Sequence, residues 1–364
     1  MGFRCGIVGL PNVGKSTIFN ALTAAGIESA NYPFCTIEPN VGMVPVPDPR
    51  LDTLAELAKT KSKVNAQMEF VDIAGLVRGA SQGEGLGNQF LGHIRQVDAI
   101  AHVVRCFEDD NIVHVSGKID PLSDREIINT ELILADLDTV RRRLNKTASQ
   151  AKSGDKLAKQ QLAWLEQLEA LLDQGKPARL LEPDEAGRAL LRELCLLTTK
   201  PVLYVANVKE SEITTGNAWV EQLRQAAAEE NASVVMISGA IEEELSLLPP
   251  EERQAFLQDM GLSEPGLHRL IKAGYELLGL ITYFTVGEKE TRAWTIHKGC
   301  KAPQAAGVIH SDFERGFIRA EVIAYQDFIA CGSEAKAREK GLLRSEGKEY
   351  VFQDGDCVNF RFNV

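Results

Sequence analysis

The chain of 364 residues has few cysteines that could act together and no long apolar run. Its seven cysteines are scattered, odd in number and never in a Cys-x-x-Cys pair, so we expect neither a zinc site nor a disulfide framework. No apolar run approaches the roughly 20 residues of a membrane span, and we expect no membrane partner. A strand-like run begins within three residues of Met1 and leaves no room for a signal peptide. These absences predict a cytoplasmic protein.

Positive charge is also scarce. The 40 lysines and arginines are outnumbered by 51 acidic residues, and the net charge of −11 argues against indiscriminate nucleic-acid binding and any DNA partner. Residues 278–364 hold 12 basic and 12 acidic residues, so this part could approach RNA more easily than the rest. Candidates for an RNA-facing patch are Arg292, Lys298, Lys301, Arg315 and Arg319. Interspersed acidic residues favour ordinary solvated charge instead.

The length predicts two or three domains, and the hydrophobic pattern predicts an α/β class for the largest. Runs rich in Val, Ile and Ala show little alternation, as in strands that are covered on both faces. They lie at residues 4–8, 69–73, 99–107, 201–208 and 233–237. Helical segments separate them, which predicts a mostly parallel sheet in one domain formed by residues 1–128 and 199–277.

A helical block at residues 129–198 interrupts the sheet pattern. Its apolar residues follow a spacing of four and three, before and after a break at Ser153-Gly154. The expected seam is Ile133, Leu137, Val140, Leu144, Thr147 and Ala151, followed by Leu157, Trp164, Leu168 and Leu171. We predict an inserted coiled-coil hairpin, which is either a structural arm or a docking element.

Residues 278–364 contain four further strand-like runs with polar and glycine-containing breaks between them. The runs are at residues 283–286, 292–296, 317–322 and 357–362. They predict a small, β-rich α+β domain.

The most informative motif is Gly-Leu-Pro-Asn-Val-Gly-Lys-Ser at residues 9–16, between a predicted strand and a predicted helix. It fits the phosphate-loop pattern, in which glycines bring backbone N–H groups close to phosphate oxygens. The lysine adds charge near the β- and γ-phosphates, and the serine hydroxyl can bind Mg²⁺. The expected phosphate-binding residues are Asn12, Val13, Gly14, Lys15, Ser16 and Thr17.

Two further segments suggest a magnesium-dependent switch. Asp72 ends a predicted strand and begins Asp-x-x-Gly, so its carboxylate could hold Mg²⁺ while Gly75 donates its N–H to the γ-phosphate. Thr36 lies about 20 residues beyond the phosphate loop and could complete the Mg²⁺ shell. The five glycines of residues 75–87 are typical of a mobile switch.

Base recognition is expected after the strand at residues 201–208. GTPases usually carry Asn-Lys-x-Asp there, whereas this chain has Asn207, Val208 and, in place of the aspartate, Glu210. A glutamate carboxylate is one methylene further out and cannot take the aspartate's place against guanine, so guanine preference should weaken. Backbone groups of Ser238, Gly239 and Ala240 could contact the base from the next loop.

Together these motifs resemble the YchF/Obg-like ATPase family of translation-factor-related P-loop GTPases. The resemblance rests on residues 9–16, 72–88, 207–210, 292–296 and 354–364 and covers nearly the whole chain. It implies a G domain, an inserted helical coiled coil and a β-grasp-like TGS domain at the C-terminus. It also implies that the chain hydrolyses ATP, to ADP and phosphate, in preference to GTP. The resemblance further implies association with the ribosome, and we expect the contacts to be with the large subunit and its rRNA.

The residue that orients the attacking water is not obvious. Many GTPases have glutamine after Asp-x-x-Gly, but Leu76 occupies this position and cannot orient water, which predicts slow turnover. His114, polar among apolar neighbours, is our candidate; a packed structural histidine is the alternative. Gln82 and Gln89 are weaker candidates, and Asn12 could instead hold K⁺.

Three functions remain open from the sequence. The first is a slow, ribosome-associated ATPase switch, and the second is a GTPase-type switch whose specificity Glu210 only weakens. The third is a non-catalytic scaffold in which the nucleotide is structural and the hairpin and C-terminal domain bind protein or RNA. A small-molecule kinase is disfavoured, because no acceptor-binding motif is present.

Overall fold

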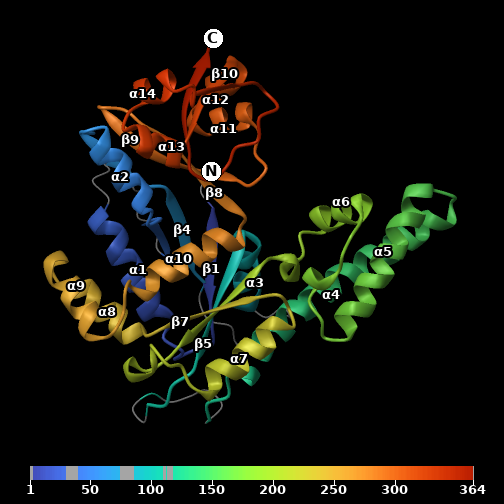
Figure 1. Ribbon diagram of the computed structural model, residues 1–364. Coiled ribbons are helices and arrows are strands. Elements are labelled where there is room, and N and C mark those ends of the chain that lie inside the picture. The colour runs from blue at the N-terminus through green and yellow to red at the C-terminus, as the bar shows by residue number, and fades with distance from the viewer. Residues whose placement is uncertain (1–2, 30–39, 74–85, 110–111, 113–117, 364) are drawn as a thin grey trace. The chain divides into compact units, whose positions relative to one another are not determined.

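The computed structural model describes residues 3–29, 40–73, 86–109, 112 and 118–363 (Figure 1). The chain forms two compact units. One comprises Met1–Met43 with Glu69–Gly274, and the other Val44–Met68 with Tyr275–Val364.

The first unit is built on a six-stranded sheet with the order β2-β4-β1-β5-β6-β7. The strands are β1 (Arg4–Val8), β2 (Val41–Pro45), β4 (Gln67–Asp72), β5 (Ala99–Arg105), β6 (Val202–Asn207) and β7 (Ser233–Ile237). The four pairings from β4 to β7 are all parallel, which confirms the predicted α/β class. From β1 the chain turns to β4 on one side and later to β5 on the other. In such sheets, ligands bind at the carboxyl ends of the strands where this change of direction occurs.

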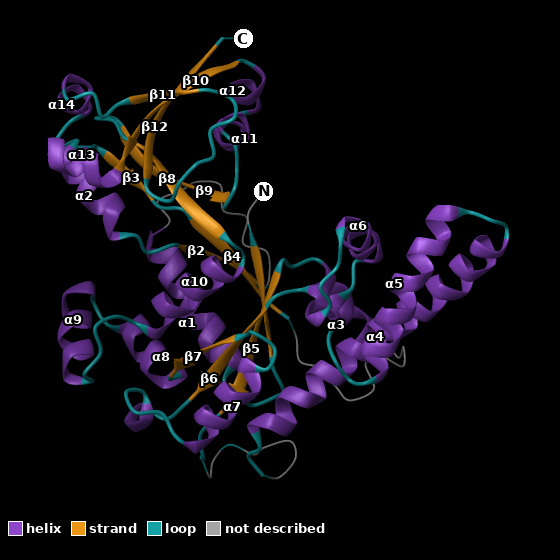
Figure 2. Cartoon of the chain, turned by 45° about the vertical axis from the view of Figure 1, so that its right-hand side comes forward, coloured by secondary structure: helices purple, strands orange, loops and turns teal. Residues whose placement is uncertain are grey.

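Helices cover this sheet and position its loops. They are α1 (Lys15–Ser29), α3 (Leu86–Arg95), α7 (Ala218–Ala228), α8 (Gly239–Leu247), α9 (Pro250–Asp259) and α10 (Gly266–Leu277). Helices α1 and α8 pack against one another, while α7 packs on β6, β7 and α4 (Figure 2). Short 3₁₀ turns connect other elements: η2 (Ala178–Leu180), η3 (Leu197–Thr199) and η4 (Glu210–Glu212). Within the described part of the chain, no helix is both long enough and apolar enough to cross a membrane.

The helical block forms an antiparallel pair, α4 (Pro121–Lys152) and α5 (Lys156–Asp173), followed by α6 (Glu185–Leu194) (Figure 1). Most of the expected seam on α4 is buried, but α5 buries Leu165, Leu168 and Leu172. Leu157 is 60% exposed, so its predicted place in the seam is wrong. The heptad cannot be continued through the turn, because Asp155 caps α5 by accepting from Leu157 N at 2.9 Å and fixes a new phase.

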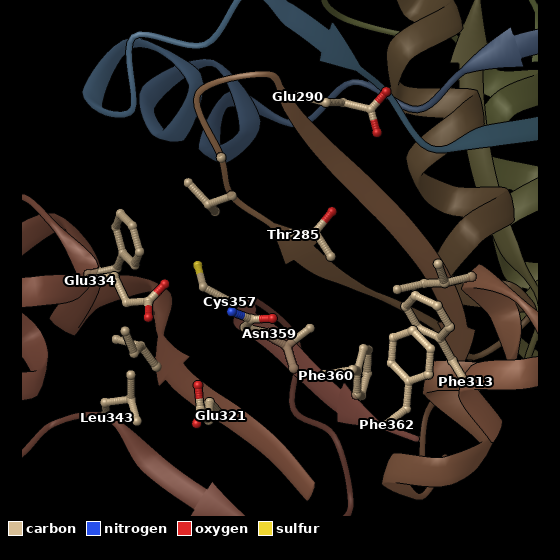
Figure 3. Close-up of a pocket in the computed structure, with 16 residues that line it drawn as sticks. Thr285, Glu290, Phe313, Glu321, Glu334, Leu343, Cys357, Asn359, Phe360 and Phe362 are labelled. Carbon is tan, nitrogen blue, oxygen red and sulfur yellow. The ribbon is translucent and has the colours of Figure 1, made fainter. Parts of the chain in front are cut away.

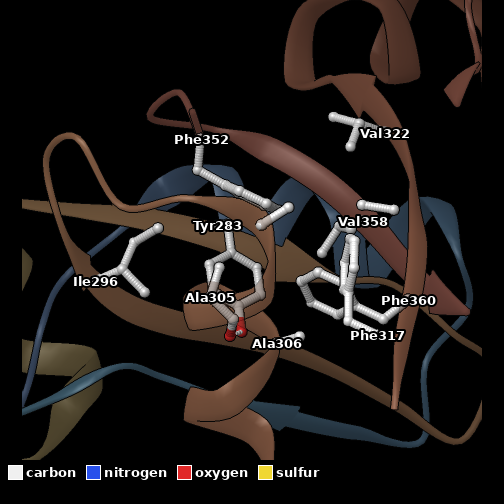
Figure 4. Close-up of a cluster of buried hydrophobic side chains, with 11 residues drawn as sticks. Tyr283, Ile296, Ala305, Ala306, Phe317, Val322, Phe352, Val358 and Phe360 are labelled. Atoms are coloured by element: carbon white, nitrogen blue, oxygen red, sulfur yellow. Dashed lines mark hydrogen bonds between the residues drawn. The ribbon is translucent and has the colours of Figure 1, made fainter. Parts of the chain in front are cut away.

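The second unit contains a mixed sheet with the order β11-β10-β12-β8-β9-β3. The strands are β3 (Ser62–Val64), β8 (Leu280–Thr285), β9 (Glu290–His297), β10 (Phe317–Ala324), β11 (Arg344–Glu346) and β12 (Asp356–Phe362). Its helices are α2 (Pro49–Leu57), α11 (Ala302–Ile309), α12 (Ser311–Arg315), α13 (Tyr325–Cys331) and α14 (Glu334–Glu339). The core gathers around the buried rings of Tyr283, Phe352 and Phe360 (Figure 4).

The segment of residues 44–68 lies in this second unit, although the sequence placed it in the nucleotide-binding domain. β3 adds to the sheet by pairing in parallel with β9. Arg50 forms a salt bridge with Asp354 at 2.7 Å, and the Thr60 hydroxyl donates to the Gly287 carbonyl at 2.6 Å. These partners are more than 200 residues away along the chain, so no local pattern could reveal them.

Candidate nucleotide-binding site

The phosphate-loop motif lies between the end of β1 and the start of α1. Asn12 and Gly14 have positive φ angles of 64° and 90°, which turn the loop beneath the helix. A Cβ on Gly14 would lie 2.1 Å from Asn207 Nδ2, so only glycine fits there. The helix then begins with a bond from Ile18 N to Gly14 O of 3.1 Å. The N–H groups of its first turn have no partner within the helix and form an anion-binding end.

Asn207, the last residue of β6, joins this loop to the one that follows β7. Its Nδ2 donates to the Val13 carbonyl at 2.9 Å, and its Oδ1 accepts from Gly239 N at 3.0 Å. The side chain is buried, so both bonds are shielded from water. One asparagine therefore fixes the phosphate loop and the loop at Ser238–Ala240 relative to each other.

Lys15 and Asp72 form an ion pair at the carboxyl ends of β1 and β4. Their side chains are only 11% and 16% exposed. The sequence thus correctly placed the lysine and the aspartate together, although the two are 57 residues apart. In this arrangement the lysine can bind a phosphate group, and the aspartate can bind the cation that accompanies the phosphate.

The donors near this pair fit Mg²⁺. Asp72 offers a carboxylate and Ser16, which is exposed, a hydroxyl. Across the described residues there is no cluster of three or more His, Cys, Asp or Glu side chains that could hold a metal unaided. Mg²⁺ in phosphate-transferring sites is held in just this way, by one or two protein oxygens together with phosphate oxygens and water.

These groups open into a cleft with a volume of about 1080 Å³, slightly larger than the roughly 300–1,000 Å³ of ordinary small-molecule sites. Of the predicted site residues, its lining includes Asn12, Gly14, Lys15, Ser16, Thr17, Asp72, Asn207, Val208, Glu210, Ser238, Gly239 and Ala240. Val13 is buried beneath the loop and takes part through its carbonyl. The cleft therefore extends from the phosphate loop to the predicted base-recognition loops.

The base-recognition loops differ in how firmly they are held. Val208 is buried, and its N–H donates to Ile237 O at 2.9 Å, whereas Glu210 is exposed in η4. Ser238 is 1% exposed, and its hydroxyl has no hydrogen-bond partner among the residues described. A buried hydroxyl without a partner is costly, so Ser238 is a candidate for a direct contact with the ligand.

Sequence reasoning missed one wall of the cleft. Phe107, Glu108, Asp109 and Ile112 line it, and they follow the carboxyl end of β5. Cys106 N donates to Asn207 O at 2.8 Å, which places this loop beside the base motif. The available signal was positional: a loop at the carboxyl end of a strand next to β1 belongs to the site.

Two ionisable side chains, one on β5 and one directly after it, are kept neutral by burial. Desolvation lowers the pKa of His102 to about 3, with Arg125 and Arg179 adding to the effect. Desolvation likewise raises the pKa of Cys106 to about 12. The histidine is therefore uncharged and the thiol protonated at neutral pH, which makes His102 a structural residue and Cys106 a poor nucleophile.

Several predicted residues lie outside the described part of the chain: Thr36, Gly75, Leu76, Gln82 and His114. Their roles stay predictions. Gln89 is described; it is exposed on α3 and is not part of the cleft's described lining.

The second unit has its own pocket, with a volume of about 320 Å³ (Figure 3). Apolar side chains such as Phe360 and Phe362 line it together with the carboxyl groups of Glu290, Glu321 and Glu334. It has no phosphate loop, and Arg319 and Arg361 already pair with Glu321. The candidate nucleotide site is therefore the cleft of the first unit.

A glycine loop at the switch point of a parallel sheet, followed by a lysine paired with an aspartate on the next strand, defines a P-loop nucleoside triphosphatase of the GTPase class. Comparisons agree with this class. Residues 4–146 match a family described as "50S ribosome-binding GTPase", and residues 280–363 match the YchF-GTPase C-terminal family, described as a protein of unknown function (DUF933).

Full-length relatives identify the family. The chain is 59% identical to the ribosome-binding ATPase YchF of Bacillus subtilis and 58% identical to that of Escherichia coli O157:H7, and the matches cover 100% of each chain. A solved structure of the Schizosaccharomyces pombe YchF GTPase superposes with a TM-score of 0.90 at 40% identity, over 99% of this chain and 98% of that one. The chain belongs to the YchF family, as the sequence motifs indicated.

Proposed function

We propose that this protein binds ATP with Mg²⁺, hydrolyses it slowly to ADP and phosphate, and uses the two nucleotide states as a switch on the ribosome. The observation that carries the proposal is the cleft that Lys15 and Asp72 line together with the predicted base-recognition residues Val208 and Ser238. The full-length relatives named as ribosome-binding ATPases support it.

The phosphate end supplies binding and charge stabilisation. Backbone N–H groups of the loop and of the first turn of α1 would hold the β-phosphate, and Lys15 would neutralise charge that develops on the γ-phosphate. Ser16 and Asp72 would hold Mg²⁺, with Thr36 as a third candidate, and the ion supplies electrophilic stabilisation of the phosphate oxygens. Gly75 would sense the γ-phosphate through its N–H.

The choice of base is the part that most needs a measurement. Glu210 is exposed, and Val208 replaces the lysine of the usual guanine motif, which supports a preference for ATP. The S. pombe relative is described as a GTPase, which favours the alternative of GTP or dual specificity. Titration of the protein with labelled ATP, followed by competition with unlabelled GTP, decides the question. A GTP affinity equal to or above that for ATP would contradict the proposal.

Hydrolysis needs a group that orients water, and we propose His114 in place of the usual glutamine, because Leu76 cannot serve. His114→Ala should slow multiple-turnover phosphate release while ATP affinity stays within twofold. An unchanged rate in the presence of ribosomes would exclude His114. Replacing K⁺ by Na⁺ in the same assay tests whether Asn12 holds a stimulating cation.

The ribosomal partner is proposed from the relatives and the family description that names the 50S subunit. We assign the contact to the large subunit and its rRNA, the C-terminal unit to the TGS type, and the protein to the cytoplasm, where ribosomes are. Neither membrane nor DNA has a role in this proposal. Sedimentation with purified 50S and 30S subunits, in ATP and in ADP, tests it; co-sedimentation with neither subunit would contradict the ribosomal role but leave the ATPase intact.

A further inference from the structure

Arg105, the last residue of β5, is 1% exposed. Among the residues that the structure describes, it has the largest side chain that is fully buried. Its Nε donates to the carbonyl of Phe107 at 3.0 Å, its Nη1 to that of Ile112 at 3.0 Å and its Nη2 to that of Asp109 at 3.3 Å. The guanidinium carbon also lies 4.6 Å from the centre of the Phe107 ring. All four contacts go to one loop.

A buried cation is expensive unless polar groups compensate it, and here three backbone carbonyls do so. What Arg105 adds is geometry, because its planar guanidinium can bind three carbonyls in fixed directions at once. The three residues that it holds by their carbonyls, Phe107, Asp109 and Ile112, line the nucleotide cleft. Burial of the Arg105 guanidinium therefore fixes the shape of one wall of the cleft.

A second set of hydrogen bonds, from Asn217, shows which part of the loop does not depend on Arg105. Asn217 Nδ2 donates to Cys106 O and to Glu212 Oε2, each at 2.8 Å, so the start of the loop is attached to the segment after the base motif without Arg105. Further along, Phe107, Asp109 and Ile112 all accept hydrogen bonds from Arg105. Loss of Arg105 should loosen the wall and leave the rest of the cleft in place.

We infer that Arg105 is a positioning residue for the nucleobase: it holds in place the wall of the cleft formed by Phe107, Asp109 and Ile112, in a loop whose start is bonded to Asn207 of the base motif. The phosphate loop is held separately, through Asn207. This inference rests on the proposed nucleotide binding and adds to it the prediction that base affinity and phosphate affinity can be separated.

The test compares Arg105→Met and Arg105→Lys with the wild-type chain in binding titrations with ATP and with inorganic tripolyphosphate. Arg105→Met should raise the Kd for ATP about tenfold, equivalent to about 1.4 kcal/mol, and leave the Kd for tripolyphosphate within twofold. Arg105→Lys keeps the charge but cannot reach three carbonyls, so its Kd for ATP should lie between that of the wild type and that of Arg105→Met. In turnover assays KM should rise while kcat stays within twofold.

Arg125→Met is the matched control. Arg125 is also a buried arginine of the first unit, but it binds the Tyr204 hydroxyl at 3.1 Å and Glu230, and it does not line the cleft. It should lose stability in urea and keep both affinities. If Arg105→Met does not fold, Arg105→Lys decides in its place, and its effect should not add to that of Phe107→Ala.

The outcomes separate two failures. If wild-type protein binds tripolyphosphate but not ATP, the proposed function is wrong. If wild-type protein binds ATP and the folded Arg105 variants bind it within twofold of wild type, or lose ATP and tripolyphosphate equally, the positioning role of Arg105 is wrong.

Discussion

Replacement of Asn207 by alanine tests whether the two halves of the cleft act as one site. The change removes two buried hydrogen bonds and leaves the Val13 carbonyl and the Gly239 N–H without their partner. Each bond contributes about 1 kcal/mol net, and buried groups left unpaired add to the loss, so we expect a total of about 2–3 kcal/mol. If about 2 kcal/mol of this appears in binding, the Kd for ATP rises about 30-fold.

Calorimetric titration with Mg²⁺-ATP measures this effect, and urea unfolding measures what part falls on stability. Asn129→Ala is the control, since Asn129 is also a buried asparagine but bonds to the Tyr204 hydroxyl at 3.4 Å, away from the cleft lining. It should leave the Kd unchanged. An ATP affinity of folded Asn207→Ala within threefold of wild type would refute the coupling of the two loops.

Three other perturbations follow from the contacts. Asp72→Asn should weaken ATP binding in Mg²⁺ but leave binding in EDTA equal or tighter, because no carboxylate then competes for Lys15; equal losses in both buffers would contradict this. Burial raises the pKa of Glu230, but its ion pairs with Arg179 and Arg125 more than offset this effect, and the pKa lies below the ordinary 4.5. The stability that ionised Glu230 contributes is therefore complete above about pH 5 and is lost as the pH falls through the lowered pKa. Glu230→Gln should cost about 3 kcal/mol of unfolding free energy in urea at pH 7 and much less at pH 3. A cost that does not depend on pH would refute this reasoning. Leu168→Ala, at a position 1% exposed, should cost roughly 2–5 kcal/mol without changing the Kd for ATP.

The sheet of the first unit could be predicted because its strands are buried on both faces and therefore read as apolar runs. The run at residues 233–237 coincides with β7, whereas that at residues 99–107 continues two residues past the end of β5. That overrun hid Phe107, because a residue assigned to a strand is not considered as part of a loop. Strand ends depend on pairing with neighbours, which a single run of residues does not contain.

The same limit explains β3. Only Val64 of its three residues is buried, while Ser62 and Lys63 are exposed, so it has no apolar pattern to detect. It is a strand because β9 lies beside it. The phosphate loop was predictable for the opposite reason: its function depends on residues adjacent in sequence, whereas the wall held by Arg105 depends on how β5 and β6 end side by side.

The contacts around Asn207 also bear on how this fold can change its base preference. Gly239, at the N-terminus of α8, packs against Thr17 of α1, since a Cβ on it would lie 3.4 Å from Thr17 Cγ2, which is an ordinary van der Waals contact. The two helix ends, Asn207 and the phosphate loop are thus in contact with one another. Glu210, by contrast, is exposed and outside this group, so it can vary without disturbing the phosphate loop. If the proposed function is right, selection between ATP and GTP would rest on residues that do not hold the phosphate loop, and the base preference could change while the contacts of that loop stay the same.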